Sequence, residues 1–166
     1  MLTSQERRER LLKWRKLEFP EFDPWYFNQI ILNEADATSD VLEIGAGSGL
    51  GLQTQMPLKS KVRTYVGIDP DDRVLANPHL DKAYVADVAE LPFDDESFDL
   101  VFHTMVAEHL ADPAAAVREC VRVLRPGGTL IFQTVSCWYY GAVIATVTPH
   151  WFHTLFVKHL GLGRIE

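Results

Sequence analysis

The chain has 166 residues, enough for one domain with a single core. Its hydrophobic content of 47% and charged content of 23% are typical of a globular protein. The weakly polar run at 137–148 is shorter than the roughly 20 residues that span a bilayer. The net charge of −7 disfavours a general affinity for nucleic acid. Cys120 and Cys137 fit neither a disulfide framework nor a metal site, and no signal-peptide pattern opens the chain, so we expect a cytoplasmic location.

The N-terminal segment differs in charge from the rest of the chain. Residues 1–18 carry six basic and three acidic side chains, a local charge of +3. Leucine and tryptophan recur there at helical spacing, which predicts a surface helix with its apolar stripe packed on the domain. A lid or a weak membrane-surface contact through residues 3–18 is the alternative. A second helix is expected over 25–33, so that residues 1–34 form an N-terminal helical segment.

From residue 35 onward, short apolar runs alternate with helical stretches. Five runs are rich in β-branched or aromatic residues and end in polar residues, as strands buried on both faces do. They cover 41–44, 64–68, 83–86, 98–102 and 129–135. This alternation predicts an α/β domain over 35–135, with a doubly wound, mostly parallel, Rossmann-like sheet. We expect the strand order 3-2-1-4-5, with N-terminal helices before the sheet and an aromatic helical tail after it.

The helix between the last two strands has clear boundaries in the sequence. Asp112 suits the N-cap, Pro113 suits the first helical position, and 114–124 is a strong helix-forming stretch. The sequence Arg-Pro-Gly-Gly at 125–128 is expected to end the helix and turn the chain into the fifth strand. Three side chains are expected to line its apolar face: Val117, Val121 and Leu124.

The stretch VLEIGAGSGLG at 41–51 places four glycines within seven residues, directly after the first strand. Glycines there permit positive φ angles and remove the Cβ atoms that would keep a ligand away from the backbone. Ligands of doubly wound sheets bind at the carboxyl ends of the strands, where these glycines lie. A plain tight turn remains the alternative explanation for Gly45, Gly47 and Gly49.

Polar residues follow the other strands at the same edge of the predicted sheet. Asp69 comes about 20 residues after Gly49, where a carboxylate can accept both hydroxyls of a ribose, although a turn cap would also explain it. Asp87 follows the third strand and can accept from an exocyclic amine, while Val88 packs on a purine face. His103 follows the fourth strand. Taken together, the four strand ends predict an adenosine-containing ligand.

Two residues distinguish between the possible adenosine ligands. A dinucleotide fingerprint G-x-G-x-x-G would need its third glycine where the chain has Leu50. Glu43 is unfavourable beside a pyrophosphate and favourable beside a cation. S-adenosylmethionine carries a sulfonium and an ammonium group, so it fits both the glycines and the acid. An NAD-dependent oxidoreductase is therefore the less favoured class, and no P-loop lysine follows the glycines.

Several of these motifs resemble those of class I S-adenosylmethionine-dependent methyltransferases of the type-11 group. VLEIGAGSGLG looks like their motif I, and VGIDPD is similar to their acidic motif on the second strand. ADVAELPFDDESFDLVF and EHLADPAAAVRECVRVLRPGGTLIF resemble the blocks that lead to the fourth and fifth strands. The resemblance runs from about residue 40 to 135. It implies a methyltransferase that uses S-adenosyl-L-methionine.

The resemblance also implies a role for each matching position. Gly45 and Gly47 would line the methionine moiety, Asp69 would hold the ribose, the pair at 87–88 would meet the adenine, and His103 would face the reacting end. The expected cofactor-binding residues are Glu43, Gly45, Gly47, Gly49, Asp69, Asp87, Val88 and His103.

The chain departs from the family pattern after its fifth strand. The family continues to an antiparallel pair of strands, whereas only 31 residues follow Val135. Residues 136–166 are expected to form an aromatic tail, which could wall an acceptor pocket or simply cover the edge of strand five. A non-catalytic S-adenosylmethionine-binding module therefore stays open beside an active enzyme. A bare edge at strand five would also favour self-association.

Methyl transfer requires alignment and exclusion of water more than a nucleophile or a metal ion. No catalytic residue is assigned, because ordinary packing or capping explains His103 and His109 better than a role as general base. The three histidines within 150–159 have no acidic or cysteine partner at their spacing, so no metal site is expected. The acidic surface and aromatic tail favour a small or lipid-like acceptor.

Overall fold

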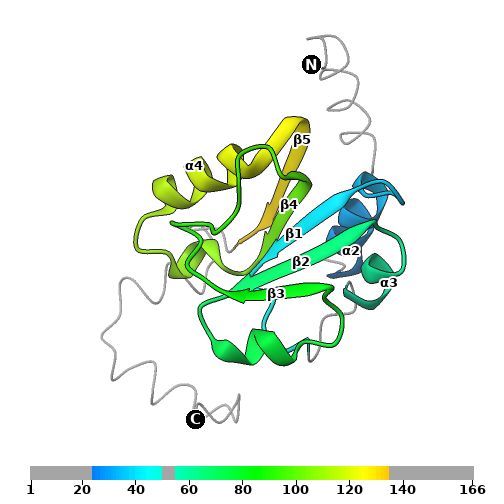
Figure 1. The fold of residues 1–166 in the computed structure, drawn as a ribbon, viewed down its shortest axis with the longest axis horizontal. Coiled ribbons are helices and arrows are strands. Elements are labelled where there is room, and N and C mark those ends of the chain that lie inside the picture. The colour runs from blue at the N-terminus through cyan, green and yellow to red at the C-terminus, as the bar shows by residue number, and fades with distance from the viewer. Residues whose placement is uncertain (1–23, 50–54, 135–166) are drawn as a thin grey trace, which may run out of the picture. The chain divides into compact units, whose positions relative to one another are not determined.

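The computed structural model of the chain describes residues 24–49 and 55–134, and its fold is drawn in Figure 1. The helix expected within 3–18 and the aromatic tail at 136–166 lie outside the described residues. Every helix and strand described below belongs to the first of two units of the chain, residues 1–133.

A five-stranded sheet forms the centre of this unit. Its order is β3-β2-β1-β4-β5, and every neighbouring pair of strands is parallel. The predicted doubly wound sheet and its strand order are therefore confirmed. The strands are β1 (Asp40–Ile44), β2 (Thr64–Asp69), β3 (Lys82–Val85), β4 (Phe98–Thr104) and β5 (Leu124–Gln133).

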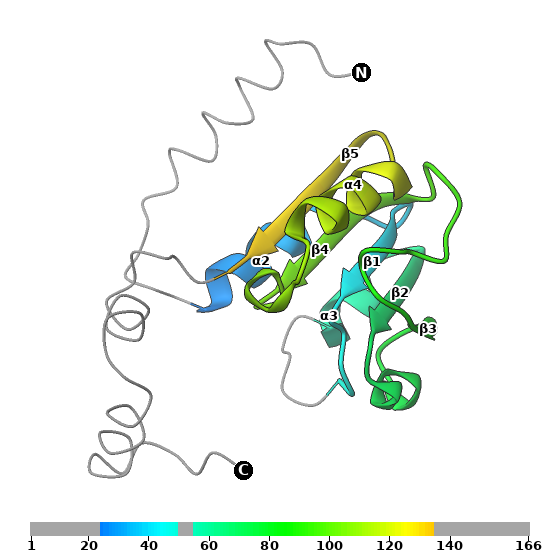
Figure 2. The same ribbon diagram turned by 90° about the vertical axis from the view of Figure 1, so that its left-hand side faces the viewer.

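Helices cover both faces of the sheet (Figures 1 and 2). Buried residues of α4 pack with one face of β1 and β2, and buried residues of α2 and α3 pack with the other face. The helices are α2 (Pro24–Glu34), α3 (Gln55–Lys59) and α4 (Pro113–Val123), with short 3₁₀ helices η1 (Asp72–Ala76) and η2 (Ala107–His109).

The residues of β1 show why this strand is mostly apolar. Leu42 and Ile44 belong to the core on the α4 side, and Val41 belongs to the core on the side of α2 and α3. Successive side chains of a strand point to opposite faces, and both faces of this sheet are covered. A largely apolar strand is the expected result, with Asp40 at its start and Glu43 within it as the acidic exceptions.

The start of α4 agrees with the prediction, but its buried face does not. The backbone N–H of Ala115 donates to Oδ1 of Asp112 at 2.9 Å, so Asp112 is the N-cap. However, Val117 is 49% exposed and Val121 is 59% exposed. The buried stripe is instead the neighbouring one, formed by Ala116, Cys120 and Val123. The prediction was wrong because it took the larger side chains as the core face, whereas small side chains let this helix lie close to the sheet.

The end of α4 also differs from the prediction. Leu124 already has an extended backbone, with φ −79° and ψ 132°, and it is the first residue of β5. The 125–128 segment lies within the span of β5, but the pairing with β4 skips it, since Leu124 pairs with Phe98 and Thr129 pairs with Leu100. An irregularity in the pairing of β4 with β5 lies between Phe98 and Leu100, and Gly127 has a φ of +89°. The chain reverses at this irregular start of β5.

Candidate functional site

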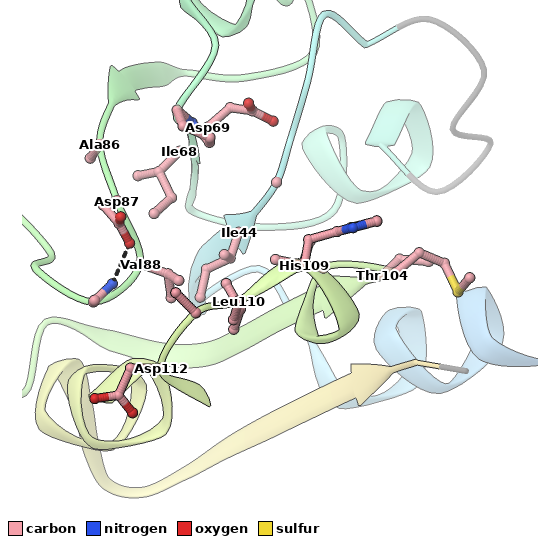
Figure 3. A pocket seen from close by; sticks show the side chains of 16 residues that line it. Ile44, Ile68, Asp69, Ala86, Asp87, Val88, Thr104, His109, Leu110 and Asp112 are labelled. Carbon is pink, nitrogen blue, oxygen red and sulfur yellow. Dashed lines mark hydrogen bonds between the residues drawn. The ribbon is translucent and has the colours of Figure 1, made fainter. Parts of the chain in front are cut away.

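A cavity of about 550 Å³ lies at the carboxyl ends of the strands, where the sequence predicts a ligand site (Figure 3). Its volume falls within the roughly 300–1,000 Å³ of small-molecule sites. The lining comes from the residues that end or follow β1, β2, β3 and β4. These residues are Ile44, Gly45, Ile68, Asp69, Pro70, Ala86, Asp87, Val88, Ala89, Thr104, Met105, Val106, His109, Leu110, Ala111 and Asp112.

Asp69 ends β2 and joins two turns at the rim of this cavity. Its Oδ2 accepts the backbone N–H of Gly47 at 3.0 Å, and its Oδ1 accepts the backbone N–H of Asp71 at 2.9 Å. The carboxylate therefore holds the glycine-rich turn against the end of β2. The predicted ribose-binding residue thus also has a structural task in the same place.

Asp87 and Val88 lie just beyond β3 and both line the cavity. Oδ1 of Asp87 accepts the backbone N–H of Ala89 at 2.8 Å, drawn as the dashed line in Figure 3. This bond fixes the turn that carries both residues. Val88 is buried and belongs to the core on the α4 side, so it forms an apolar wall of the cavity.

The three glycines of the turn differ in what a side chain at each position would contact. Gly45 lines the cavity with a φ of +73°, and a Cβ atom added there would lie 2.5 Å from Cγ2 of Val106. A Cβ at Gly49 would lie 2.6 Å from Oδ1 of Asn77, while a Cβ at Gly47 would meet none of the described residues within 4 Å. Packing against the rest of the chain therefore explains two of the glycines. Gly47 and Gly49 do not line the cavity.

Glu43 lies in β1 outside the cavity lining, and it is only 3% exposed. Its Oε2 accepts hydrogen bonds from Nε2 of Gln55, at 2.8 Å, and from the hydroxyl of Tyr65. Burial raises the pKa of Glu43 to about 7, although these two hydrogen bonds act in the opposite direction. Among the described residues, its hydrogen-bond partners are protein side chains behind the turn.

Two amide side chains support the glycine-rich turn from behind. Nδ2 of Asn77 donates to the backbone carbonyls of Ala46, at 3.0 Å, and Gly47, at 3.1 Å. Nε2 of Gln55 donates to the same Ala46 carbonyl at 3.0 Å. Sequence reasoning missed both residues, because the only local signal is an asparagine before Pro78, which is typical of any turn.

The two histidines considered as bases lie in different places. His109 belongs to η2 and lines the cavity at the strand ends. His103 was predicted to follow the fourth strand. It lies inside β4 instead, because the strand continues to Thr104. It lines a second cavity of about 190 Å³ beside α4 and does not line the first.

Part of the first cavity comes from the loop between β4 and α4, in which sequence reasoning considered only His109, as a weak candidate for a general base. This loop contributes Val106, Leu110 and Asp112, and it includes Met105 at a φ of +55°. The rule that ligands bind beyond strand ends could have found these residues. Instead, Asp112 was interpreted only as a helix cap.

Within 24–49 and 55–134, no group of three or more histidine, cysteine, aspartate or glutamate side chains could hold a metal ion. In the same part of the chain, no helix is long and apolar enough to cross a membrane.

Comparison with known proteins identifies the fold. A family model described as a methyltransferase domain matches residues 42–132. A probable S-adenosylmethionine-dependent methyltransferase from Mycolicibacterium smegmatis is 40% identical over 103 residues, which cover 59% of this chain and 38% of that protein. A ubiquinone biosynthesis O-methyltransferase from Pseudomonas putida is 31% identical over 125 residues, which cover 70% of this chain and 53% of that protein.

A solved structure agrees with the match to the methyltransferase family model. The YcgJ protein from Bacillus subtilis superposes with a TM-score of 0.57 at 27% identity, over 64% of this chain and 49% of that one. The chain thus spans only part of the length of these relatives. The matching family model nevertheless covers more than half of the 166 residues, and the chain belongs to the family of methyltransferase domains.

Proposed function

We propose that this chain binds S-adenosyl-L-methionine in the first cavity and catalyses methyl transfer to a small or lipid-like acceptor. The observation that carries the proposal is the placement of two carboxylates, Asp69 and Asp87, around a cavity that is also lined by Gly45, which has no side chain. Family membership supports the same reading. The relative named for ubiquinone biosynthesis supports a small-molecule acceptor.

The lining residues fit the chemical groups of this cofactor. Asp69 would accept the ribose hydroxyls, and Asp87 would accept the exocyclic amine of the adenine. Apolar side chains, including Ile44 and Val88, would contact the purine face. Gly45 presents its backbone to the cavity and no side chain. Glu43, which sequence reasoning placed beside the cation, would act indirectly by supporting the turn.

When bound, the cofactor supplies an already activated methyl group, so the tasks of this chain are alignment and exclusion of water. The apolar residues of the loop after β4 suit the second task. If the acceptor must lose a proton, His109 is the base candidate on the first cavity. The buried thiol of Cys120 is compatible with the cytoplasmic location that we propose.

A non-catalytic module that holds the same cofactor is the second candidate. The observation in its favour is that the chain matches only 38% and 53% of the lengths of two relatives. Acceptor residues in those proteins can therefore lie in parts that this chain does not match. An NAD-dependent oxidoreductase is less favoured, because Leu50 occupies the position of the third fingerprint glycine.

Calorimetry on the full chain tests the cofactor class. We expect binding of S-adenosylmethionine and of its demethylated product, and no binding of NAD. Binding of NAD alone, or of none of the three, would refute the proposal. Transfer of a tritiated methyl group from the cofactor to a panel of phenols and fatty acids then separates an enzyme from a binding module.

A further inference from the structure

The second cavity lies beside the first, among β4, β5 and α4. It has a volume of about 190 Å³, and four residues line both cavities: Ile44, Val88, Val106 and Leu110. The remaining lining residues are His103, Ala107, Pro113, Ala116, Val117, Cys120, Leu130 and Phe132. Among the described residues, this lining contains no aspartate, glutamate, lysine or arginine. Burial also raises the pKa of the Cys120 thiol to about 11, which keeps it uncharged.

One polar group in this apolar surrounding has no partner. His103 is 7% exposed, and its Nδ1 is buried without a hydrogen bond in the described part of the chain. Its ring stacks on Phe132, with centroids 5.3 Å apart and planes 14° apart. Burial lowers the pKa of His103, although the charge of Glu108 acts in the opposite direction, so the neutral imidazole is favoured. An unpaired buried nitrogen is costly and rare in folded proteins.

We propose that the second cavity is a binding site for a small neutral molecule that has an apolar ring and a hydroxyl group bonded to Nδ1 of His103. A charged molecule would lose its hydration there and find no charged partner. A neutral imidazole nitrogen is either a donor or an acceptor, and a hydroxyl group can serve both forms.

The size of the cavity suits one ring. An apolar cavity of about 150 Å³ in another protein binds benzene, and this cavity is somewhat larger at about 190 Å³. Val117 and Phe132, which line it, are both about half exposed, so its rim reaches the surface of the described structure. A monocyclic phenol therefore has the right size, polarity and hydrogen-bonding group.

The shared lining residues place this occupant next to the first cavity. This position would let the occupant serve as the methyl acceptor. That role rests on the proposed function, whereas the binding of the occupant does not. The experiment below therefore measures binding without the cofactor and without turnover.

The full chain, labelled with ¹⁵N and ¹³C, is titrated with phenol and, separately, with toluene. Toluene has the same ring, with a methyl group in place of the hydroxyl group. We expect phenol to shift the imidazole ¹⁵N resonances of His103 and the methyl resonances of Ala116, Val117 and Leu130. Phenol should bind about tenfold more tightly than toluene, the effect of one hydrogen bond to an otherwise unpaired group.

Two variants and a control locate the site. His103→Phe keeps an aromatic ring and removes the nitrogen, so phenol should lose its advantage over toluene. Ala116→Leu fills the cavity from α4 and should remove binding of both compounds. Ala114→Leu makes the same change at an exposed position of the same helix and should leave binding unchanged. The titration of the parent chain decides the question even if a variant does not fold.

Equal affinity for phenol and toluene, or phenol binding that leaves the His103 resonances unshifted, would overturn the inference. Absence of phenol binding at millimolar concentration would overturn it as well. A parallel titration with S-adenosylmethionine, followed at Gly45 and Asp69, tests the proposed function separately. Failure of that titration removes the acceptor role and leaves the phenol result standing.

Discussion

Oδ2 of Asp69 accepts the backbone N–H of Gly47 at 3.0 Å, so the end of β2 holds the turn that follows β1. The same carboxylate is the expected partner of the cofactor ribose. Asp69 therefore both shapes the cavity and faces it, and its removal should affect binding by two routes.

Replacing Asp69 with alanine should weaken S-adenosylmethionine binding by on the order of 2–4 kcal/mol, because charge-assisted hydrogen bonds to the ribose are lost. Asp69→Asn keeps one oxygen that can accept from Gly47, so its loss should be smaller. Calorimetry measures both affinities. If Asp69→Ala binds the cofactor as well as the parent does, the ribose assignment is wrong.

Gly45→Ala should destabilise the fold more than Gly47→Ala. Both positions have positive φ angles, +73° and +52°, and this conformation costs a non-glycine residue roughly 1–2 kcal/mol. Only at Gly45 would the new Cβ also meet Cγ2 of Val106, at 2.5 Å. Urea unfolding measures the difference. Gly45→Ala should cost less stability in a Val106→Ala background than in the parent, and an equal cost in both backgrounds would show that this contact is not the cause.

The stability contributed by Glu43 should fall as pH rises. Its carboxyl has a pKa of about 7 in the folded chain, against an ordinary value of 4.5, so the folded state holds this proton more tightly than the unfolded state does. Its contribution is fully present below pH 4.5 and is lost as pH rises to about 7. The total loss is about 3 kcal/mol.

Comparison with Glu43→Gln isolates this effect from the other carboxyl groups. The glutamine keeps an oxygen for Gln55 and Tyr65 and does not titrate, so parent minus variant stability should decline between pH 4.5 and pH 7. Denaturant unfolding at several pH values measures the difference. A constant difference over this range would contradict the prediction.

Asn77→Ala should weaken cofactor binding, although Asn77 does not line the cavity. The change leaves the carbonyls of Ala46 and Gly47 without this donor and should cost about 1–3 kcal/mol of stability. Leu75→Ala, at a 61% exposed position of the neighbouring η1, serves as the control and should change neither quantity. Unfolding and calorimetry on the same samples show whether both effects occur together.

Self-association through the edge of β5 is a further prediction. β5 is an outer strand of the sheet that the described residues form, and it carries the 53% exposed side chain of Phe132. Exposed edge strands favour pairing between chains, and a lysine on the edge opposes it. Sedimentation velocity should therefore show larger species at micromolar concentration, reduced in Phe132→Lys. A parent chain that sediments as a monomer at all concentrations would exclude this interface.

The sequence alone determined the sheet and the end of the sheet at which the first cavity lies. Five short apolar runs and the spacing of Gly45, Asp69 and Asp87 were sufficient, because strand pattern and strand-end position are properties of local sequence. The cap of α4 at Asp112 was likewise readable from adjacent residues.

The tertiary structure decided which polar groups meet. Glu43 binds the hydroxyl of Tyr65, 22 positions away, and Asn77 supports carbonyls about 30 positions earlier in the chain. The buried stripe of α4 depends in the same way on the packing of helix against sheet, and so does Nδ1 of His103, which has no hydrogen bond within the described part of the chain. Periodicity shows that a helix or strand has an apolar face, but the contacts of each side chain follow from long-range packing, which brings together residues that no local pattern relates.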